Sequence, residues 1–380
     1  GGGGGGASII FEDDFETNQG WVVNPNATDT ATKGMWERAI PQATSSSSGG
    51  LKQLATTVSG VYDLVTGPIG GGVGDHDIDG GATSIQSPSI SLPAVGSNED
   101  LVLSFSYYFA HTTNSTKADY FRVSVVTATS AGVSTTLVYD DQGDAGDVDA
   151  EWIARTINLD SFAGQSIQLL FEAGNTGQGH LIEAAVDDVK VETIVATNYV
   201  FNDDFETDKG WIVNPSSTDT ATKGLWERGN PESTAQVSVM MQLGGTISGL
   251  HNLVTGRLSG AINAADHDVD GGITTIRSPD ILLPPISNSE SLELSLSYYF
   301  AHNADASIDD YLRVTVVGTT NTVVLEELGD ASVDGGVWDS LNFNLNSYAG
   351  QTIYLLVESE DGGTASLGEA AIEDVRITKT

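Results

Sequence analysis

The sequence predicts an all-β protein made of two tandem antiparallel β-sandwich domains of the jelly-roll type. The chain carries an internal duplication, in which the motif at 11–16 returns at 201–206 and the match continues to the chain end. Within each copy apolar and polar residues alternate, as at 101–107, 121–125 and 166–171, with the two-residue period of strands that have one buried face. Clusters of Gly, Asn, Asp, Ser and Thr separate these runs, and no window has the periodicity and caps of a long amphipathic helix. Short strands with frequent turns are typical of two-sheet sandwiches and jelly rolls.

The duplication also sets the domain boundaries. Each copy falls within the usual size range of a single domain with its own core. We expect a Gly-rich linker at 1–7, a first jelly-roll domain at 8–193, a connector at 194–198 and a second jelly-roll domain at 199–380. Because the chain starts with Gly and not Met, we expect a processed or excised piece. A connector this short predicts a semi-rigid tandem.

Charge and cysteine content exclude several classes of partner. The formal net charge is -37, from 52 acidic and 15 basic residues, and it repels nucleic-acid phosphates and anionic lipid surfaces. No stretch approaches the roughly 20 consecutive apolar residues of a membrane span, so no membrane insertion is expected. With no Cys, disulfides and thiolate metal sites are excluded. A protein this acidic can be stabilised by divalent cations bound in carboxylate clusters, by a high-salt medium that screens the repulsion between its charges, or by both.

Three acidic clusters recur in both copies, on the opening strand, in the middle and on the last strand. Calcium is the cation we expect there, because it accepts about 6 to 8 oxygens in a flexible shell that sandwich loops can provide. The predicted metal ligands are Asp14, Glu16, Asp77, Asp79, Asp187 and Asp188 in the first copy, and Asp204, Glu206, Asp268, Asp270, Glu373 and Asp374 in the second. The alternative is that these are solvated turn and edge carboxylates of an acidic protein.

The middle cluster, Asp-x-Asp-x-Asp-Gly at 75–80, resembles the start of an EF-hand loop. The twelfth position is Gln86 in one copy and Arg277 in the other, so the bidentate Glu of an EF-hand is missing. We therefore expect a tertiary site where the first strand, this loop and the last strand meet. Strand alternation places Asp187 on the face of the neighbouring valines, towards the core, where a carboxylate needs a cation or a strong donor.

Enzymatic signatures are missing from the sequence. The six His do not follow a zinc-protease spacing, and there is no nucleophile elbow, phosphate-binding loop or dinucleotide fingerprint. Paired carboxylates could serve glycoside hydrolysis, but the acids here cluster as ligands do. We therefore expect no enzyme activity, and we interpret His111 and His302 as hydrogen-bonded structural residues.

Aromatic residues offer a second kind of candidate site. Alternation puts Phe105, Tyr107 and Phe109 on the core face, and leaves Tyr108 and its counterpart Tyr299 on the other sheet surface. These two tyrosines are candidate ligand-binding residues, as a platform on which sugar rings stack. The alternative is that the aromatic residues fill or line the sandwich core.

The order of motifs resembles a known family. Asp-Asp-Phe-Glu, Gly-Trp, Trp-Glu-Arg, Ser-Tyr-Tyr-Phe and Glu-Ala-Ala-x-(Asp/Glu)-Asp-Val occur in both copies, and this order is similar to the MAM-like jelly-roll modules appended to secreted bacterial peptidases such as zinc carboxypeptidases. The resemblance implies a cation, usually calcium, beside the first and last strands, held by Asp14, Glu16 and Asp188 and by Asp204, Glu206 and Asp374. It also implies that any catalytic domain lies outside this chain. Animal receptor MAM domains carry disulfides, which this chain lacks, so receptor adhesion does not transfer.

These observations favour a secreted, non-catalytic, calcium-stabilised tandem module for adhesion or for glycan or polymer targeting within a larger extracellular protein. Its expected partner is a polysaccharide or glycan. The alternative is a structural subunit of an extracellular filament or surface layer, in which copies of the chain assemble through cation-bridged β-domains.

Overall fold

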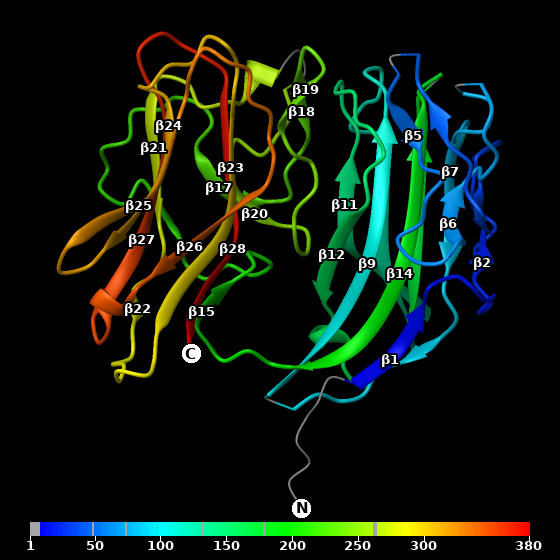
Figure 1. Cartoon of the computed structure of the whole chain (residues 1–380), viewed down its shortest axis with the longest axis horizontal. Coiled ribbons are helices and arrows are strands. Elements are labelled where there is room, and N and C mark those ends of the chain that lie inside the picture. Colours follow the sequence, from blue (N-terminus) through cyan, green and yellow to red (C-terminus); the bar gives the residue numbers. More distant parts are fainter. Residues whose placement is uncertain are drawn as a thin grey trace, which may run out of the picture. The chain divides into compact units, whose positions relative to one another are not determined.

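The computed structural model describes residues 8–47, 49–72, 74–96, 98–130, 132–177, 179–260 and 264–380, and confirms the all-β prediction. The predicted linker at 1–7 lies outside the described residues. The chain divides into two compact units, 1–197 and 198–380, each with its own pair of antiparallel sheets (Figure 1). The last strand of the first unit continues to Val195 and so includes residues 194 and 195, which the sequence prediction assigned to the connector.

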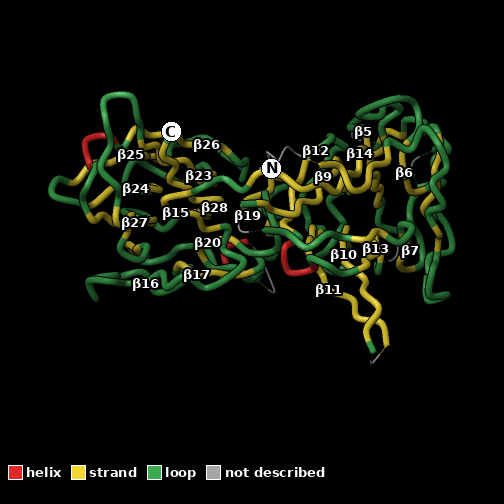
Figure 2. The backbone as a smooth tube through the Cα atoms, turned by 90° about the horizontal axis from the view of Figure 1, so that it is seen from below, coloured by secondary structure: helices red, strands yellow, loops and turns green. Residues whose placement is uncertain are grey.

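Each unit is a sandwich of two six-stranded sheets, seen as two layers in Figure 2. In the first unit, one sheet has the order β12 (Ile153–Asn158), β9 (Glu99–His111), β14 (Ile182–Val195), β6 (Asp63–Thr66) and β3 (Trp36–Ala39), with β1 (Ser8–Asp13) also paired to β14. The other has the order β11 (Gly132–Gln142), β10 (Tyr120–Thr129), β13 (Ser166–Asn175), β7 (Gly81–Gln86) and β2 (Val22–Val23), with β8 (Ile90–Ser91) paired to β13. A short ribbon of β4 (Thr44–Ser45) and β5 (Leu51–Gln53) and the 3-10 turn η1 (Asp160–Phe162) complete the unit.

The second unit repeats this topology. One sheet has the order β17 (Trp226–Gly229), β20 (Asn252–Thr255), β28 (Gly368–Lys379), β23 (Leu292–His302) and β26 (Asp339–Asn344), with β15 (Tyr199–Asp203) paired to β28. The other has the order β16 (Ile212–Val213), β21 (Gly272–Arg277), β27 (Thr352–Asp361), β24 (Tyr311–Val317) and β25 (Asn321–Leu328), with β22 (Ile281–Leu282) paired to β27. The ribbon β18 (Thr234–Gln236) and β19 (Val239–Gln242) and the turns η2 (Ala264–Asp266) and η3 (Asn346–Tyr348) complete it.

The core of each unit lies between its two sheets and is filled by the apolar halves of the alternating strands. In the first unit Leu103, Phe105 and Tyr107 of β9 pack there against Phe121 and Phe171 of the facing sheet. These side chains are almost fully removed from water, which is the dominant favourable term in folding. In the described part of the chain no helix is long and apolar enough to cross a membrane.

A β-bulge in β14 changes which face the acidic residues occupy. Val186 and Val189 both point into the core although three positions separate them, because the pairing with β9 shifts between Asp187 and Lys190. Asp188 sits in the bulge with a left-handed backbone (φ 52°), and Asp374 repeats this conformation in the second unit. The prediction that Asp187 points towards the core is therefore wrong: Asp187 is fully buried, but on the outer face of the sheet.

Candidate functional site

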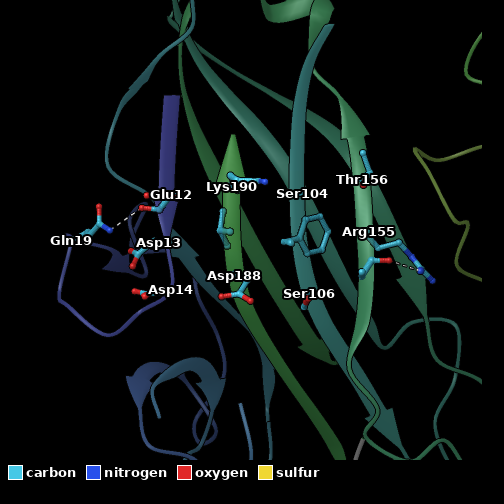
Figure 3. A pocket seen from close by; sticks show the side chains of 13 residues that line it. Glu12, Asp13, Asp14, Gln19, Ser104, Ser106, Arg155, Thr156, Asp188 and Lys190 are labelled. Atoms are coloured by element: carbon cyan, nitrogen blue, oxygen red, sulfur yellow. Dashed lines mark hydrogen bonds between the residues drawn. The ribbon is translucent and has the colours of Figure 1, made fainter. Parts of the chain in front are cut away.

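A polar trough of about 580 Å³ lies on the first unit, over β1, β14, β9 and β12. Ser104 and Ser106 of β9 line it because they alternate with the core residues Leu103 and Phe105. Figure 3 shows polar side chains from four strands and the loop after β1 gathered around this trough. The polar lining residues are Glu12, Asp13, Asp14, Gln19, Ser104, Ser106, Arg155, Thr156, Asp188 and Lys190.

One end of the trough is formed where β1 meets the bulge of β14, and here Asp14 and Asp188 both project into it (Figure 3). The backbone turns sharply after Asp14, since Phe15 has a left-handed conformation (φ 59°), as does Phe205 in the second unit (φ 60°). Such conformations cost of order 1–3 kcal/mol for residues other than Gly and are retained where the surroundings enforce them. Two contacts hold Phe15 in this backbone conformation. Its side chain is fully buried in the core, and its N–H donates to the Asp13 carboxylate at 2.8 Å.

The segment 57–62, which we name the rim loop, covers this end of the site. Its backbone N–H groups donate to two of the predicted metal ligands: Val61 and Tyr62 to Glu16 Oε1 at 2.7 and 2.8 Å, and Val58 to Asp187 Oδ2 at 2.8 Å. The second unit repeats the arrangement with Glu206 and Glu373. These acids are thus already bonded to the backbone, as structural carboxylates are.

Asp14 and Asp188 remain as the carboxylates best placed for a calcium ion. Ser59 donates its hydroxyl to Asp188, and Asp14 accepts only the nearby N–H of Glu16 at 3.1 Å among the bonds the structure shows. Among the described residues, no three predicted ligands bring one carboxylate oxygen each within 4.8 Å of one another. The two carboxylates fit calcium only if backbone carbonyls and water supply the rest of its shell, which calcium readily accepts.

A further carboxyl group, that of Asp63 at the start of β6, directly follows the rim loop and was not among the predicted ligands. It is fully buried and neither of its oxygens has a hydrogen-bond partner. Burial, and then the nearby Asp187 carboxylate, raise the pKa of Asp63 to about 8. Asn252 takes its place in the second unit and removes the ionisable group, a change visible in the sequence alignment of the two copies.

The middle cluster does not join this site. Ile78 bonds through its N–H to the carbonyl of Ile182 at the start of β14, while Asp187 lies beyond that point along the same strand. Asp79 forms an ion pair with Lys33 at 3.0 Å, and Asp270 pairs with Lys223 in the second unit. The hypothesis of one site formed by the first strand, the 75–80 loop and the last strand is therefore wrong, since the acids divide into two groups.

The second group contains a residue that the sequence analysis missed, Glu183. It is 2 % exposed, and its Oε2 lies 3.4 Å from the Thr66 hydroxyl. Asp77 is 3 % exposed with Oδ1 unpartnered, and burial, then the Asp79 carboxylate, raise its pKa to about 6. The repeated Glu-Ala-Ala motif carried the signal, because Glu369 keeps the same burial and the same threonine contact in the second copy.

The predicted aromatic platform does not exist at the surface. Tyr108 and Tyr299 do leave the core face, but each is only 1 % exposed. Tyr108 packs edge-on against Trp152 at 4.9 Å, and Tyr299 against Trp338 at 4.9 Å, in small clusters with apolar residues of the β4–β5 and β18–β19 regions. The prediction that these rings are open to sugars is wrong. The alternative, that aromatic residues fill or line the sandwich core, holds for Phe105 and Tyr107 but not for Tyr108 and Tyr299, which are buried on the other face of their sheets.

Comparison with known proteins gives similarity of low strength. No protein-family model matches the chain, and no curated protein matches it. It is similar to the solved CBM22-1–CBM22-2 tandem of Xyn10C from Paenibacillus barcinonensis, with 15% identity, 99% of this chain and 98% of that chain covered, and a TM-score of 0.29. The K3 cleaved adhesin domain of Lys-gingipain from Porphyromonas gingivalis w83 has 18% identity, 48% and 97% coverage and a TM-score of 0.28. TmCBM61 in complex with beta-1,4-galactotriose has 12% identity, 45% and 88% coverage and a TM-score of 0.27. None of these similarities assigns the chain to a family.

Proposed function

We propose that the chain is a non-catalytic tandem module that binds a neutral glycan through the polar trough of its first unit. The observation that supports this is the lining of the trough: hydroxyl, amide, carboxylate and cationic groups from four strands face one open hollow. A sugar polymer presents alternating hydroxyl donors and acceptors, and such a lining can satisfy both. Among the described residues that line the trough, Phe105 is the only aromatic one, and its ring packs in the core with 2 % exposure. Recognition therefore rests on hydrogen bonds and not on stacking.

The second unit retains part of this chemistry. Ser295 and Ser297 occupy the positions of Ser104 and Ser106, since both pairs face the same residues of the last strand. Leu341 replaces Arg155 at the equivalent pairing position. This difference lies on the core face, because Arg155 Nε donates to the buried Tyr139 hydroxyl at 2.9 Å. Weak binding by both units to one polymer would raise the overall affinity, because the second contact becomes intramolecular.

Calcium is part of this proposal as a stabiliser of the trough. Asp14 and Asp188 would hold the ion, with Asp204 and Asp374 in the second unit, and the ion would fix the junction between first and last strands. The module would act outside the cell, as an appendage of a larger secreted protein of the kind that carries MAM-like modules. The net charge of -37 favours a neutral ligand over an acidic polysaccharide.

Affinity electrophoresis of the full chain through gels that contain neutral xylan or β-1,4-galactan, with calcium present, tests the proposal. Ser106→Trp places an indole in the trough and is expected to abolish retardation. Ser134→Trp adds the same ring to an exposed site on β11 of the opposite sheet and should leave retardation unchanged. Equal retardation of both variants, or no retardation of the unmodified chain in any neutral polymer, would overturn the assignment of the trough.

A further inference from the structure

The two units differ at the loop that crosses the end of β9 and β23. In the first unit this loop supplies Asp147 and Asp149, whose carboxylates lie 2.7 and 2.8 Å from the Lys52 ammonium. Lys52 is fully buried and also donates to the Val148 carbonyl at 2.9 Å. The first unit therefore carries its own cation against this loop.

The second unit has lost that cation and both of its partners together. Met241 stands in place of Lys52, since Gln53 and Gln242 follow them with matching bonds to the chain. Because Val148 and Asp334 form the same isolated bridge, to His111 and His302 respectively, Val333 and Gly335 replace Asp147 and Asp149. In exchange the loop gains a carboxylate, Asp334, where the first unit has Val148.

Asp334 faces the ring of His302, which is 2 % exposed. The two residues exchange backbone hydrogen bonds of 2.9 Å in both directions, so their side chains are held opposite one another. The Nδ1 atom of His302 lies 3.1 Å from the Asn303 carbonyl, which can only accept, so this nitrogen carries the proton. In the neutral ring Nε2 then presents a lone pair, and it lies 3.3 Å from Asp334 Oδ2. Two acceptors at this distance require a cation or a proton between them.

A second carboxylate completes the group. Ligand atoms of His302, Asp330 and Asp334 all lie within 4.8 Å of one another, and within the described ranges this is the one such trio of His, Asp or Glu. Ser332 donates its N–H to Asp330 at 2.6 Å and orients that carboxylate. Both aspartates are exposed, so an ion can enter from water and water can complete its shell.

We propose that His302, Asp330 and Asp334 form a binding site for a divalent first-row transition metal of the zinc type, present in the second unit alone. One imidazole nitrogen and two carboxylate oxygens suit zinc, whereas calcium selects oxygen ligands. Tetrahedral ligands at zinc bond lengths stand about 3.3 Å apart, close to the separation of Nε2 from Oδ2. The Nδ1–H bond to the Asn303 carbonyl is the outer contact that orients a metal-binding histidine. This site shares no residue with the lining of the glycan trough or with the predicted calcium ligands.

Isothermal titration of the full chain with zinc, in excess calcium to fill oxygen-only sites, tests this proposal. The unmodified chain should bind one zinc ion, not two, because His111 faces Val148. Asp334→Val, which installs the residue of the first unit, and Asp330→Asn should each weaken binding by about tenfold or more. Asp339→Asn removes a nearby exposed carboxylate outside the trio and should bind as the parent does. Circular dichroism checks that each variant is folded.

Two results would overturn the proposal. One is an absence of zinc binding by the folded parent chain, which would show that a proton, and not a metal, lies between Nε2 and Asp334. The other is unchanged zinc affinity in Asp334→Val. Cobalt substitution adds a direct readout, because its visible absorption should report nitrogen and oxygen ligands in the parent and disappear in Asp334→Val.

Discussion

Single residues show how strongly surroundings alter the same side chain in two copies of one fold. Asp144 and Asp330 occupy equivalent positions, since Gly143 and Gly329 make the same backbone bond just before them. Asp144 is 6 % exposed and its Oδ2 has no partner, whereas Asp330 is exposed. Burial is the main cause that raises the pKa of Asp144 to about 7.

A pH dependence follows from Asp144. Between pH 4 and 7 the folded state holds a proton that the unfolded chain has released, so the free energy of unfolding falls as pH rises through about 7. The slope from this group is at most about 1.4 kcal/mol per pH unit. Asp144→Asn keeps an acceptor for the Gly146 N–H but cannot ionise, and should gain stability relative to the parent from pH 4 to 8. Urea unfolding of both proteins across this range measures the difference, and a difference that does not vary with pH would contradict the buried, protonated Asp144.

At the residue scale, the alternation of apolar and polar residues predicted correctly which face of the sheet most side chains occupy. It did not predict burial where another element covers the outer face of the sheet. Phe105 and Tyr107 point into the core as expected. Tyr108 points the other way as expected, but apolar residues around β5 and Trp152 cover it, and no local pattern reveals such a cover. The alternation pattern placed Asp187 on the wrong face because a β-bulge adds one residue to the strand. The bulge has Asp188 in the left-handed conformation, and an Asp in the sequence indicates that conformation less clearly than a Gly would.

At the scale of elements, the rim loop is held by carboxylates and not by regular pairing. We call the bonds from the rim loop to Glu16 the clamp. Gly60 makes it possible, because it has φ +61° and a Cβ atom there would lie 2.2 Å from Glu16 Oε1. Gly249 stands in the same relation to Glu206 in the second unit. The Gly and the Glu therefore act together, because the absence of a side chain at the Gly lets the Glu carboxylate reach the rim loop. The sequence analysis named Glu16 and Glu206 as predicted metal ligands and did not single out these glycines.

The clamp predicts a local change in dynamics. Glu16→Ala removes the acceptor of two backbone N–H groups, and hydrogen bonds to a charged group contribute about 1.5–3 kcal/mol each. The amides of Val61 and Tyr62 should then exchange with solvent at least tenfold faster, while the core strands keep their protection. Hydrogen exchange followed by mass spectrometry measures this, with the second-unit peptide over 246–251 as internal control. Slow exchange of the 57–62 peptide in the variant would show that the loop is held by other contacts.

The division of the acids into two groups also belongs to the element scale. Recurrence of the clusters in both copies marked Asp14, Asp77 and Asp188 as needed by the unit, but spacing along the chain carries no information on which strands become neighbours. The pairing of β1 with the late half of β14, and of the 75–80 loop with its start, decides the grouping. That pairing depends on the whole sandwich, so the jelly-roll class was predictable and the composition of each site was not.

For the whole molecule, the main question is how two acidic units without disulfides remain stable. Each has its own core, and the formal charge of -37 disfavours the compact state through self-repulsion. Screening by salt reduces this repulsion without regard to position, whereas a bound ion acts at a defined site. An experiment at constant ionic strength distinguishes general screening by salt from stabilisation by a bound ion.

Thermal melts of the full chain at fixed high ionic strength, with calcium or with a chelator, make that separation. An ion that binds the folded state alone stabilises it by about 2.7 kcal/mol at one hundred times its dissociation constant, so the melting temperature of each unit should rise with calcium. Asp188→Asn should remove the gain in the first unit and Asp374→Asn in the second, because each removes a carboxylate from its junction of first and last strands. Magnesium at equal concentration is the control, since its demand for near-octahedral geometry suits this open junction poorly. Equal melting temperatures in calcium and chelator would show that the acids serve as solvated surface and as acceptors for the rim loop, and that the charge reflects a saline medium.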